Sequence, residues 1–117
     1  MAIPSLNLTL TPWEYYILLA LTNKTLHGYG IRNQVAHDSN GSVIIPSGTL
    51  YPALHRLDQK GLIHRIEAES RGKPVYRYQL TRVGKYRLND EISRLETATA
   101  HAHFKLGHKL SANGWLV

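Results

Sequence analysis

The stretch that decides the fold is Pro46–Leu57, PSGTLYPALHRL. Its leucines return at the spacing of a single helix face: Leu50, Leu54 and Leu57. This periodicity predicts a helix with one apolar side. Ser47 is the expected N-cap, and Gly61 is the residue expected to stop the helix. Pro52 removes one backbone donor, so we expect a tight or slightly bent first turn and not a break.

Two further helices are expected upstream, over residues 11–21 and 27–41. Thr11 and Glu14 have the spacing of a capping box, which marks the start of the first helix. An Asn-Gly pair closes the second helix with a C-cap signal. Tyr29 is expected on the inward side of this second helix.

A hairpin is expected downstream of the deciding stretch. Residues 62–68 and 74–80 alternate between apolar and polar side chains, a pattern that predicts two strands. The turn between them contains Arg71-Gly72-Lys73, which is basic and has a glycine that permits the reversal.

A long last helix is expected after Thr81, and its apolar positions form a coiled-coil seam. A terminal helix of this length exceeds what a small domain needs to close its core. We therefore expect the seam to join two copies of the chain, with packing on its own domain as the alternative. Gly107 is expected to weaken this helix, and Ser111–Gly114 is expected to fray. The seam positions step by four and three residues: Leu88, Ile92, Leu95, Thr99, Ala102 and Leu106.

The positive charge of the chain is concentrated in its middle. The 117 residues include 14 Lys and Arg against 8 Asp and Glu, a formal charge of +6. Ser47 to Leu88 contain 9 basic and 3 acidic residues, so 9 − 3 = +6 accounts for the whole excess. Such a segregated basic block indicates a surface that faces phosphate groups. A basic face without a partner is the alternative.

The order helix, helix, helix, hairpin, helix is that of a winged helix-turn-helix. This is an α+β fold, mainly α, with three helices, a two-stranded wing and here a long C-terminal dimerisation helix. The second helix of the motif enters the DNA major groove, so we expect a homodimer on a pseudo-palindromic site of double-stranded DNA. The expected contacts are Ser47, Gly48, Thr49, Tyr51, Pro52, His55, Arg56 and Lys60 on the helix and Arg71, Lys73 and Arg77 on the wing.

Two of these residues are the expected readers of DNA. Tyr51 and His55 lie one helical turn apart and are expected to share an exposed face that reaches base edges or phosphates. A core position for Tyr51 and a merely solvated His55 are the alternatives. Arg56 and Lys60 are expected at the flank, closer to the DNA backbone than to the bases.

Length and composition exclude several classes of protein. The chain is too short for a TIM barrel, which needs about 250 residues, and it has no Cys for disulfides or thiolate metal sites. Without a nucleophile–base pair, a P-loop or a dinucleotide fingerprint, neither an enzyme nor a cofactor is expected. No apolar run approaches the roughly 20 residues of a membrane span, so a cytoplasmic protein is expected. We expect an N-terminal arm (1–10), a DNA-binding domain (11–80) and a dimerisation helix with a tail (81–117).

Two rival functions remain open. The histidines His101, His103 and His108 lie near one helix end, and His101 and His108 share a face, whereas His103 is expected to point elsewhere. This pattern favours solvated histidines over a metal-responsive regulator, and no metal site is predicted. A winged helix used for protein contacts is the second rival, but it does not need a cationic helix and wing.

Several motifs together resemble the PadR family of bacterial transcriptional regulators. They are Leu26–Tyr29, Pro46–Leu57, Lys60–Ile63, Arg71–Pro74, Tyr76–Thr81 and Gly84. The resemblance runs from about Leu18 to Leu88, more than half of the chain, and the short C-terminal region is similar to the smaller subfamily with a single terminal helix. It implies a winged helix that dimerises through its C-terminal helix, with the first helix, including Tyr16, contributing.

The same resemblance implies a repressor that loses DNA affinity when a small aromatic or phenolic effector binds. Compact members of the family hold flat ligands between tryptophans of the two subunits. This singles out Trp13 and Trp115 as ligand contacts. Core packing is the alternative for Trp13.

Overall fold

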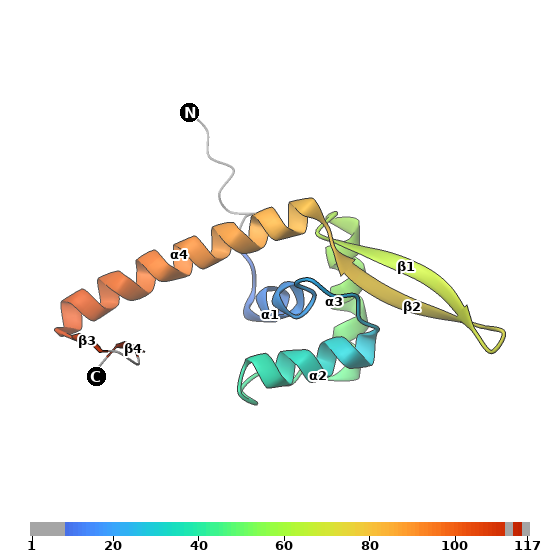
Figure 1. Ribbon diagram of the computed structural model, residues 1–117, viewed down its shortest axis with the longest axis horizontal. Coiled ribbons are helices and arrows are strands. Elements are labelled where there is room, and N and C mark those ends of the chain that lie inside the picture. The colour runs from blue at the N-terminus through green and yellow to red at the C-terminus, as the bar shows by residue number, and fades with distance from the viewer. Residues whose placement is uncertain (1–8, 112–113, 116–117) are drawn as a thin grey trace.

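The computed structural model describes residues 9–111 and 114–115 (Figure 1). The described part of the chain contains four helices: α1 (Pro12–Ala20), α2 (Gly28–Asp38), α3 (Ser47–Gln59) and α4 (Arg82–Leu106). Its strands are β1 (Ile63–Ser70), β2 (Lys73–Leu80), β3 (Leu110–Ser111) and β4 (Gly114–Trp115). The predicted class, a mainly helical winged helix-turn-helix with a long terminal helix, is the observed one.

The core forms where α1 packs among the other three helices. Ile17 and Leu18 of α1 are fully buried, as is Ile31 of α2. The predicted apolar side of α3 is buried too, with Leu50, Leu54 and Leu57 at 1% exposure or less. In Figure 1 the wing extends to one side of this core, and the C-terminal half of α4 extends to the other.

The helix starts follow local signals, with one exception. The capping box of α1 is present, because Thr11 Oγ1 accepts from the Glu14 backbone at 3.1 Å and Glu14 Oε1 accepts from the Thr11 backbone at 2.9 Å. Ser47 was predicted to be the N-cap of α3, but it is the first helical residue. Pro46 is the N-cap, and its carbonyl accepts from the backbone of Thr49 and Leu50.

The helix ends are set by residues in left-handed conformation. At the end of α2, Asn40 has φ 53°, and the Gly41 backbone donates to the Ala36 carbonyl at 2.7 Å. Gly61, with φ 76°, ends α3 in the same way, which confirms it as the stop. Helix α3 continues unbroken through its internal proline, as expected.

Tyr29 departs from the prediction for α2. We expected it on the inward side, but its side chain is 63% exposed. Tyr29 lies in the first turn of α2 and borders a hollow beside the wing, whereas Ile31 and Val35 take the buried positions.

Strands β1 and β2 form an antiparallel hairpin, the wing, with Ile63 opposite Leu80 and Ser70 opposite Lys73. The strands are longer than predicted because only two residues, Arg71 and Gly72, make the turn. Both have positive φ, as a type I′ turn requires. The base of the wing is anchored by Tyr78, which is buried and pairs with Leu26 of the α1–α2 connection.

Helix α4 begins after Thr81, whose Oγ1 accepts from the Gly84 backbone at 2.9 Å. Gly107 does not weaken the helix but terminates it, with φ 72°. The chain then reverses, and the His108 backbone donates to the His103 carbonyl at 2.9 Å. The reversal brings the two imidazoles together, with Nδ1 atoms 2.7 Å apart.

This geometry corrects two expectations about the C-terminal end. His108 pairs with His103 and not with the face of His101, because the helix does not continue through Gly107. The tail is not simply frayed, since β3 and β4 pair with Leu110 opposite Trp115. Residues 1–8 of the expected N-terminal arm and residues 112–113 and 116–117 of the tail lie outside the described residues.

Among the described residues, no helix is both long enough and apolar enough to cross a membrane.

Candidate nucleic-acid interface

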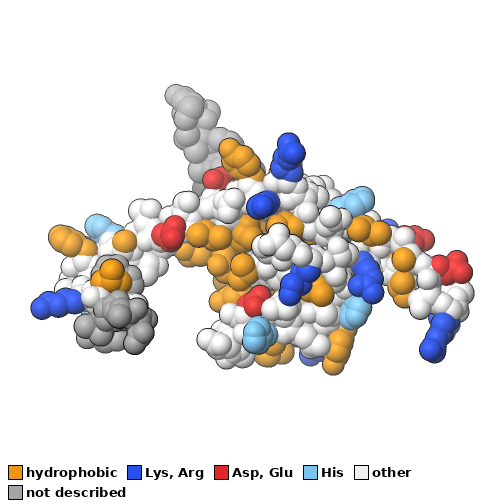
Figure 2. Space-filling view, in the orientation of Figure 1, with side chains coloured by type: hydrophobic (Ala, Val, Ile, Leu, Met, Phe, Trp, Pro, Cys, Tyr) orange, Lys and Arg blue, Asp and Glu red, His pale blue; other side chains and the backbone are white. Residues whose placement is uncertain are grey.

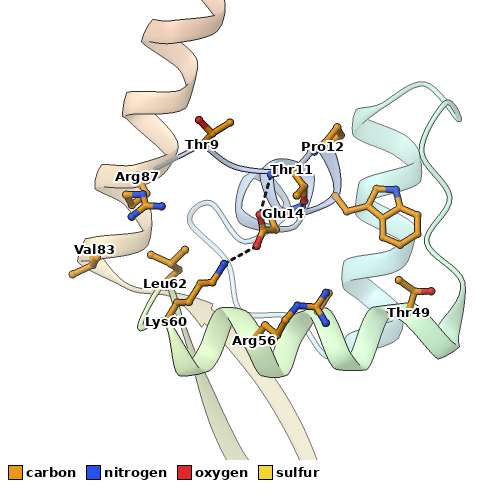
Figure 3. Close-up of a pocket in the computed structure, with 12 residues that line it drawn as sticks. Thr9, Thr11, Pro12, Glu14, Thr49, Arg56, Lys60, Leu62, Val83 and Arg87 are labelled. Atoms are coloured by element: carbon orange, nitrogen blue, oxygen red, sulfur yellow. Dashed lines mark hydrogen bonds and ion pairs between the residues drawn. The ribbon is translucent and has the colours of Figure 1, made fainter. Parts of the chain in front are cut away.

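Helix α3 has two polar sides, one on each flank of its buried leucine face. Tyr51 and His55 are exposed on the side that faces the wing. Thr49, Arg56 and Lys60 lie on the opposite side, toward the N-terminal end of α1 (Figure 3). The sequence-predicted contacts on this helix therefore fall into two groups with different surroundings.

The wing side of α3 borders a small cleft of about 230 Å³. Tyr51 and His55 form its helical wall, and Tyr76 and Arg65 form the opposite wall on the wing. The Arg65 guanidinium lies 4.5 Å from the centre of the Tyr76 ring, a cation–π contact. Tyr51 is 53% exposed, so the alternative of a core aromatic residue does not apply.

The N-terminal end of α3 is open. Ser47, Gly48 and Pro52 are exposed, and a Cβ atom added at Gly48 would meet nothing within 4 Å. Free backbone N–H groups at such a helix start attract anions. This end can therefore approach a phosphate group closely.

The wing carries the remaining predicted contacts on its surface. Arg71 lies in the turn, Lys73 and Arg77 lie on β2, and all three are exposed. Arg77 also borders a second hollow, between the wing and the start of α2, together with His27 and Tyr29. Tyr51 borders both hollows and thus links Arg77 on the wing with His55 on α3, whereas Arg71 and Lys73 lie at the far end of the wing.

The other polar side of α3 faces a larger hollow of about 970 Å³ between α1, α3 and the start of α4 (Figure 3). Trp13 is half-buried in its wall. The charged side chains around it are those of Arg56, Lys60, Arg87 and Glu14. The hollow therefore combines an aromatic wall with an excess of positive charge.

Glu14 is the acidic group of this hollow and bonds to Lys60. The Lys60 ammonium lies 3.2 Å from Glu14 Oε2. Burial by itself raises the pKa of Glu14, but hydrogen bonds from the Thr11 backbone and from Lys60 outweigh it and hold the pKa below its ordinary value. Glu14 is therefore a carboxylate at neutral pH.

A sequence profile of the transcriptional regulator PadR-like family matches residues 17–90, which hold the end of α1, all of α2, α3 and the wing, and the start of α4. The chain belongs to the PadR-like family. PadR-like proteins are transcriptional regulators and not enzymes, as the sequence predicted.

Solved PadR structures have the same fold. A PadR family transcription regulator from Clostridium difficile is 28% identical, covers 82% of this chain and 99% of its own, and superposes with a TM-score of 0.70. A PadR-like transcription factor from Bacteroides fragilis is 31% identical over 78% of this chain and 87% of its own, with a TM-score of 0.64. Bacillus subtilis PadR, solved in complex with operator DNA, is 28% identical over 68% of this chain and 45% of its own, with a TM-score of 0.62.

In this PadR-like chain, sequence reasoning did not single out four residues of the candidate interface. His27, Tyr29, Arg65 and Tyr76 border the hollows between α2, α3 and the wing. The strand register carries part of the signal, because Arg65 lies opposite Tyr78 and Tyr76 opposite Glu67, on neighbouring positions of the hairpin. The place of His27 and Tyr29 beside the wing depends on tertiary packing.

The expected seam of α4 divides into a buried and an open part. Leu88 is 4% exposed and belongs to the core of its own chain. Leu95, Thr99, Ala102 and Leu106 are exposed. Tyr16 on α1 and Ile92 on α4 are half-buried and pack against the core, and Figure 2 shows apolar side chains gathered beneath α4 where it passes α1.

The two tryptophans lie in different parts of the PadR-like fold. Trp13 borders the large hollow, whereas the backbone of Trp115 pairs with Leu110 and its side chain lies outside what the structure describes. No group of three or more His, Cys, Asp or Glu in the described part of the chain is placed to hold a metal ion.

Proposed function

We propose that this PadR-like protein binds double-stranded DNA sequence-specifically through α3 and the wing. One observation carries the proposal: the exposed Tyr51 and His55 side of α3 adjoins a basic wing, within the segment that holds all six net charges. The proposed contacts are Ser47, Gly48, Thr49, Tyr51, Pro52, His55 and Arg56 on α3 and Arg71, Lys73 and Arg77 on the wing. The solved complex of Bacillus subtilis PadR with operator DNA supports the proposal that the protein binds DNA.

The working unit proposed is a homodimer. Exposed leucines on the C-terminal half of α4 leave an apolar stripe that a single chain does not cover, with Leu95 at 38% and Leu106 at 70% exposure. A second copy of the chain buries such a stripe by pairing α4 with α4, and Tyr16 and Ile92 extend the contact toward α1. The proposed interface is Tyr16, Ile92, Leu95, Thr99, Ala102 and Leu106.

A symmetric dimer reads a symmetric site. The two copies of α3 enter successive major grooves about 34 Å apart, so the operator is a pseudo-palindrome with half-sites one helical turn apart. A protein fixed on such a site excludes other proteins from the same DNA, and repression is the proposed outcome.

The effector site proposed is the hollow beside Trp13. An aromatic wall with Arg56 and Lys60 nearby suits a flat phenolic carboxylate, which would stack on the indole and pair with a cation. Because Arg56 and Lys60 belong to α3, a ligand here would shift the DNA-contacting helix directly. The test is a titration with 4-hydroxybenzoate of the Trp115→Phe variant, in which Trp13 is the remaining tryptophan. Quenching of its fluorescence, with release of bound DNA, is expected; an unaltered signal at millimolar ligand contradicts the site.

The decisive test of DNA binding is selection of fragments from genomic DNA of the source organism, followed by fluorescence anisotropy on the recovered sequence. We expect half-sites related by a two-fold axis and affinity that falls steeply with salt. Absence of binding to any duplex at low salt would refute the function.

A further inference from the structure

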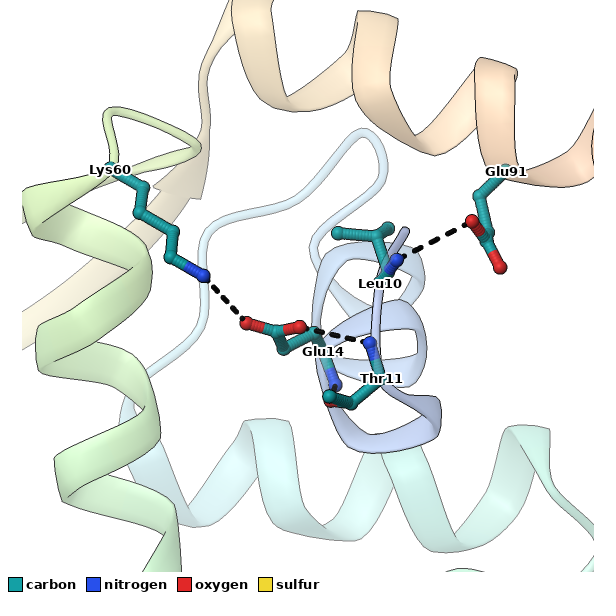
Figure 4. Close-up of polar contacts among 5 residues, drawn as sticks. All are labelled: Leu10, Thr11, Glu14, Lys60 and Glu91. Atoms are coloured by element: carbon teal, nitrogen blue, oxygen red, sulfur yellow. Dashed lines mark hydrogen bonds and ion pairs between the residues drawn. The ribbon is translucent and has the colours of Figure 1, made fainter. Parts of the chain in front are cut away.

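Lys60 lies at the C-terminal end of α3, where the sequence placed a phosphate contact, but its ammonium turns away from the wing. It reaches across to α1 and pairs with Glu14 at 3.2 Å, a contact between residues 46 positions apart (Figure 4). The Lys60 side chain is 55% exposed and that of Glu14 is 12% exposed. Glu14 is therefore the largely buried partner of the pair, and Lys60 is the exposed partner.

The Glu14 carboxylate is held in place from its other side. Its Oε1 atom accepts from the Thr11 backbone at 2.9 Å as part of the capping box, which leaves Oε2 for Lys60. A carboxylate already oriented by a backbone hydrogen bond loses little freedom when a lysine pairs with it. The Glu14 carboxylate is thus already oriented to accept the Lys60 ammonium.

The same segment is tied to α4. The Leu10 backbone donates to Glu91 Oε1 at 3.4 Å, and the Glu91 side chain, which is almost fully buried, also pairs with Arg94. Polar contacts therefore run from α3 through the start of α1 to α4, the helix proposed to join the two copies (Figure 4). The segment from Leu10 to Glu14 therefore connects the end of α3 with the helix proposed to form the dimer contact.

On the side of α3 that carries Lys60, apolar side chains do not fill the space between α3 and the start of α1. The hollow of about 970 Å³ separates α3 from the N-terminal end of α1, and the Lys60–Glu14 pair bridges it (Figure 3). The leucine face of α3 packs in the same core as Ile17 and Leu18 of α1, and on the open side of α3 the Lys60–Glu14 pair adds the contact that holds the end of the helix against α1.

We propose that Lys60 and Glu14 form a tether that sets the orientation of α3, so that Lys60 is a positioning residue for DNA recognition and not a phosphate contact. An ammonium paired with a carboxylate releases fewer counterions from DNA than an unpaired one. The tether rests on the proposed DNA-binding function, since it assigns a role within it.

The test uses the full chain with two duplexes of equal length, one holding the selected operator and one of random sequence. Lys60→Met and Glu14→Gln should each lower the ratio of operator affinity to random affinity about tenfold. In Lys60→Met the slope of log affinity against log salt should stay at the value of the unmodified protein. Lys60→Arg, which retains the pair, should restore the ratio, and the double variant should lose no more than either single one.

Lys73→Met is the matched control, because Lys73 is exposed at the wing turn. It should weaken binding to both duplexes alike and reduce the salt slope by about 1. If Lys60→Met behaves like Lys73→Met, Lys60 is a phosphate contact and the tether is overturned. An unchanged affinity ratio in Glu14→Gln overturns it as well.

A DNA-free measurement separates the tether from the function on which it rests. Amide hydrogen exchange at the C-terminal end of α3 should accelerate equally in Lys60→Met and Glu14→Gln, with Lys60→Arg close to the unmodified protein. Unchanged exchange in both variants overturns the tether even if the protein binds DNA. Accelerated exchange without DNA binding by the unmodified protein refutes the function and leaves the tether standing.

Discussion

The ring of Tyr51 on α3 lies against the backbone of Gly28, the first residue of α2. A Cβ atom at position 28 would be 2.6 Å from the Tyr51 hydroxyl oxygen and 2.8 Å from the nearest ring carbon. The glycine therefore provides the space in which the ring rests. Although Tyr51 is half-exposed, one edge of its ring is supported by α2, and this support sets the direction in which the hydroxyl points.

Gly28→Ala should displace the Tyr51 ring and weaken operator binding about tenfold, because a tyrosine supported in one direction loses less entropy on binding than a mobile one. Anisotropy on the selected operator measures the effect. In a Tyr51→Ala background, Gly28→Ala should have no further effect, since the clash is gone. A similar loss in both backgrounds would contradict the role of the contact.

Gly84→Ala should destabilise the fold by about 1–3 kcal/mol, because the added Cβ clashes with packed backbone. It would lie 1.9 Å from the Leu62 carbonyl oxygen, where α4 meets the base of the wing. Gly48→Ala is the matched control, with no atom within 4 Å of the added Cβ, and should be neutral or slightly stabilising. Urea unfolding at one protein concentration compares the two, and equal stabilities would refute the close approach.

Leu95→Asp should convert the proposed dimer into monomers that retain the winged helix. Its side chain is exposed in the single chain, so the change spares the core. The loss of two buried leucines in a symmetric interface weakens association by about 10²–10³-fold. Sedimentation velocity measures this, and Ala100→Asp, on the same helix but off the seam, should remain dimeric. A dimer that survives Leu95→Asp refutes the seam.

Arg71→Asn should raise stability by about 1 kcal/mol while weakening DNA binding, because Asn tolerates the left-handed backbone better than Arg. Arg71 has φ 54° in the turn of the wing. Thermal unfolding and anisotropy separate the two effects. If stability and affinity fall together, the arginine has a structural role in the turn that its geometry does not predict.

The His103–His108 contact should open as the solution is acidified. Burial and the neighbouring His108 lower the pKa of His103 below its ordinary value of 6.5. The stability that the contact contributes is therefore complete above that value and is lost as the pH falls through the lowered pKa, when Nδ1 of His103 is protonated and can no longer accept a hydrogen bond. The protection of the His108 amide, which donates to the His103 carbonyl, against hydrogen exchange should be constant above about pH 6.5 and fall as the pH is lowered below that value. His103→Phe should abolish that pH dependence, and an unchanged dependence would exclude the pair as its source.

The sequence by itself determined the features that depend on neighbours within a few residues. The capping box of Thr11 and Glu14, the stop at Gly61 and the leucine face of α3 follow from backbone hydrogen bonding and helical period. The basic wing and the order of the elements could likewise be predicted from the sequence. Together they indicated the fold class and the family. Even the misplaced cap at Ser47 was wrong by a single residue.

The tertiary structure decided which distant residues each side chain contacts. Lys60 pairs with Glu14, which is 46 residues away in the sequence. Leu88 was expected in the dimer seam but is buried in the core of its own chain. His108 meets His103 because a left-handed glycine reverses the chain. The physical reason is common to these cases: periodicity assigns a side chain to a face of a helix, but the element packed against that face depends on distant parts of the chain. The sequence could thus predict a basic surface of six net charges, while the role proposed for each cation depends on the packing of α1, α3 and α4.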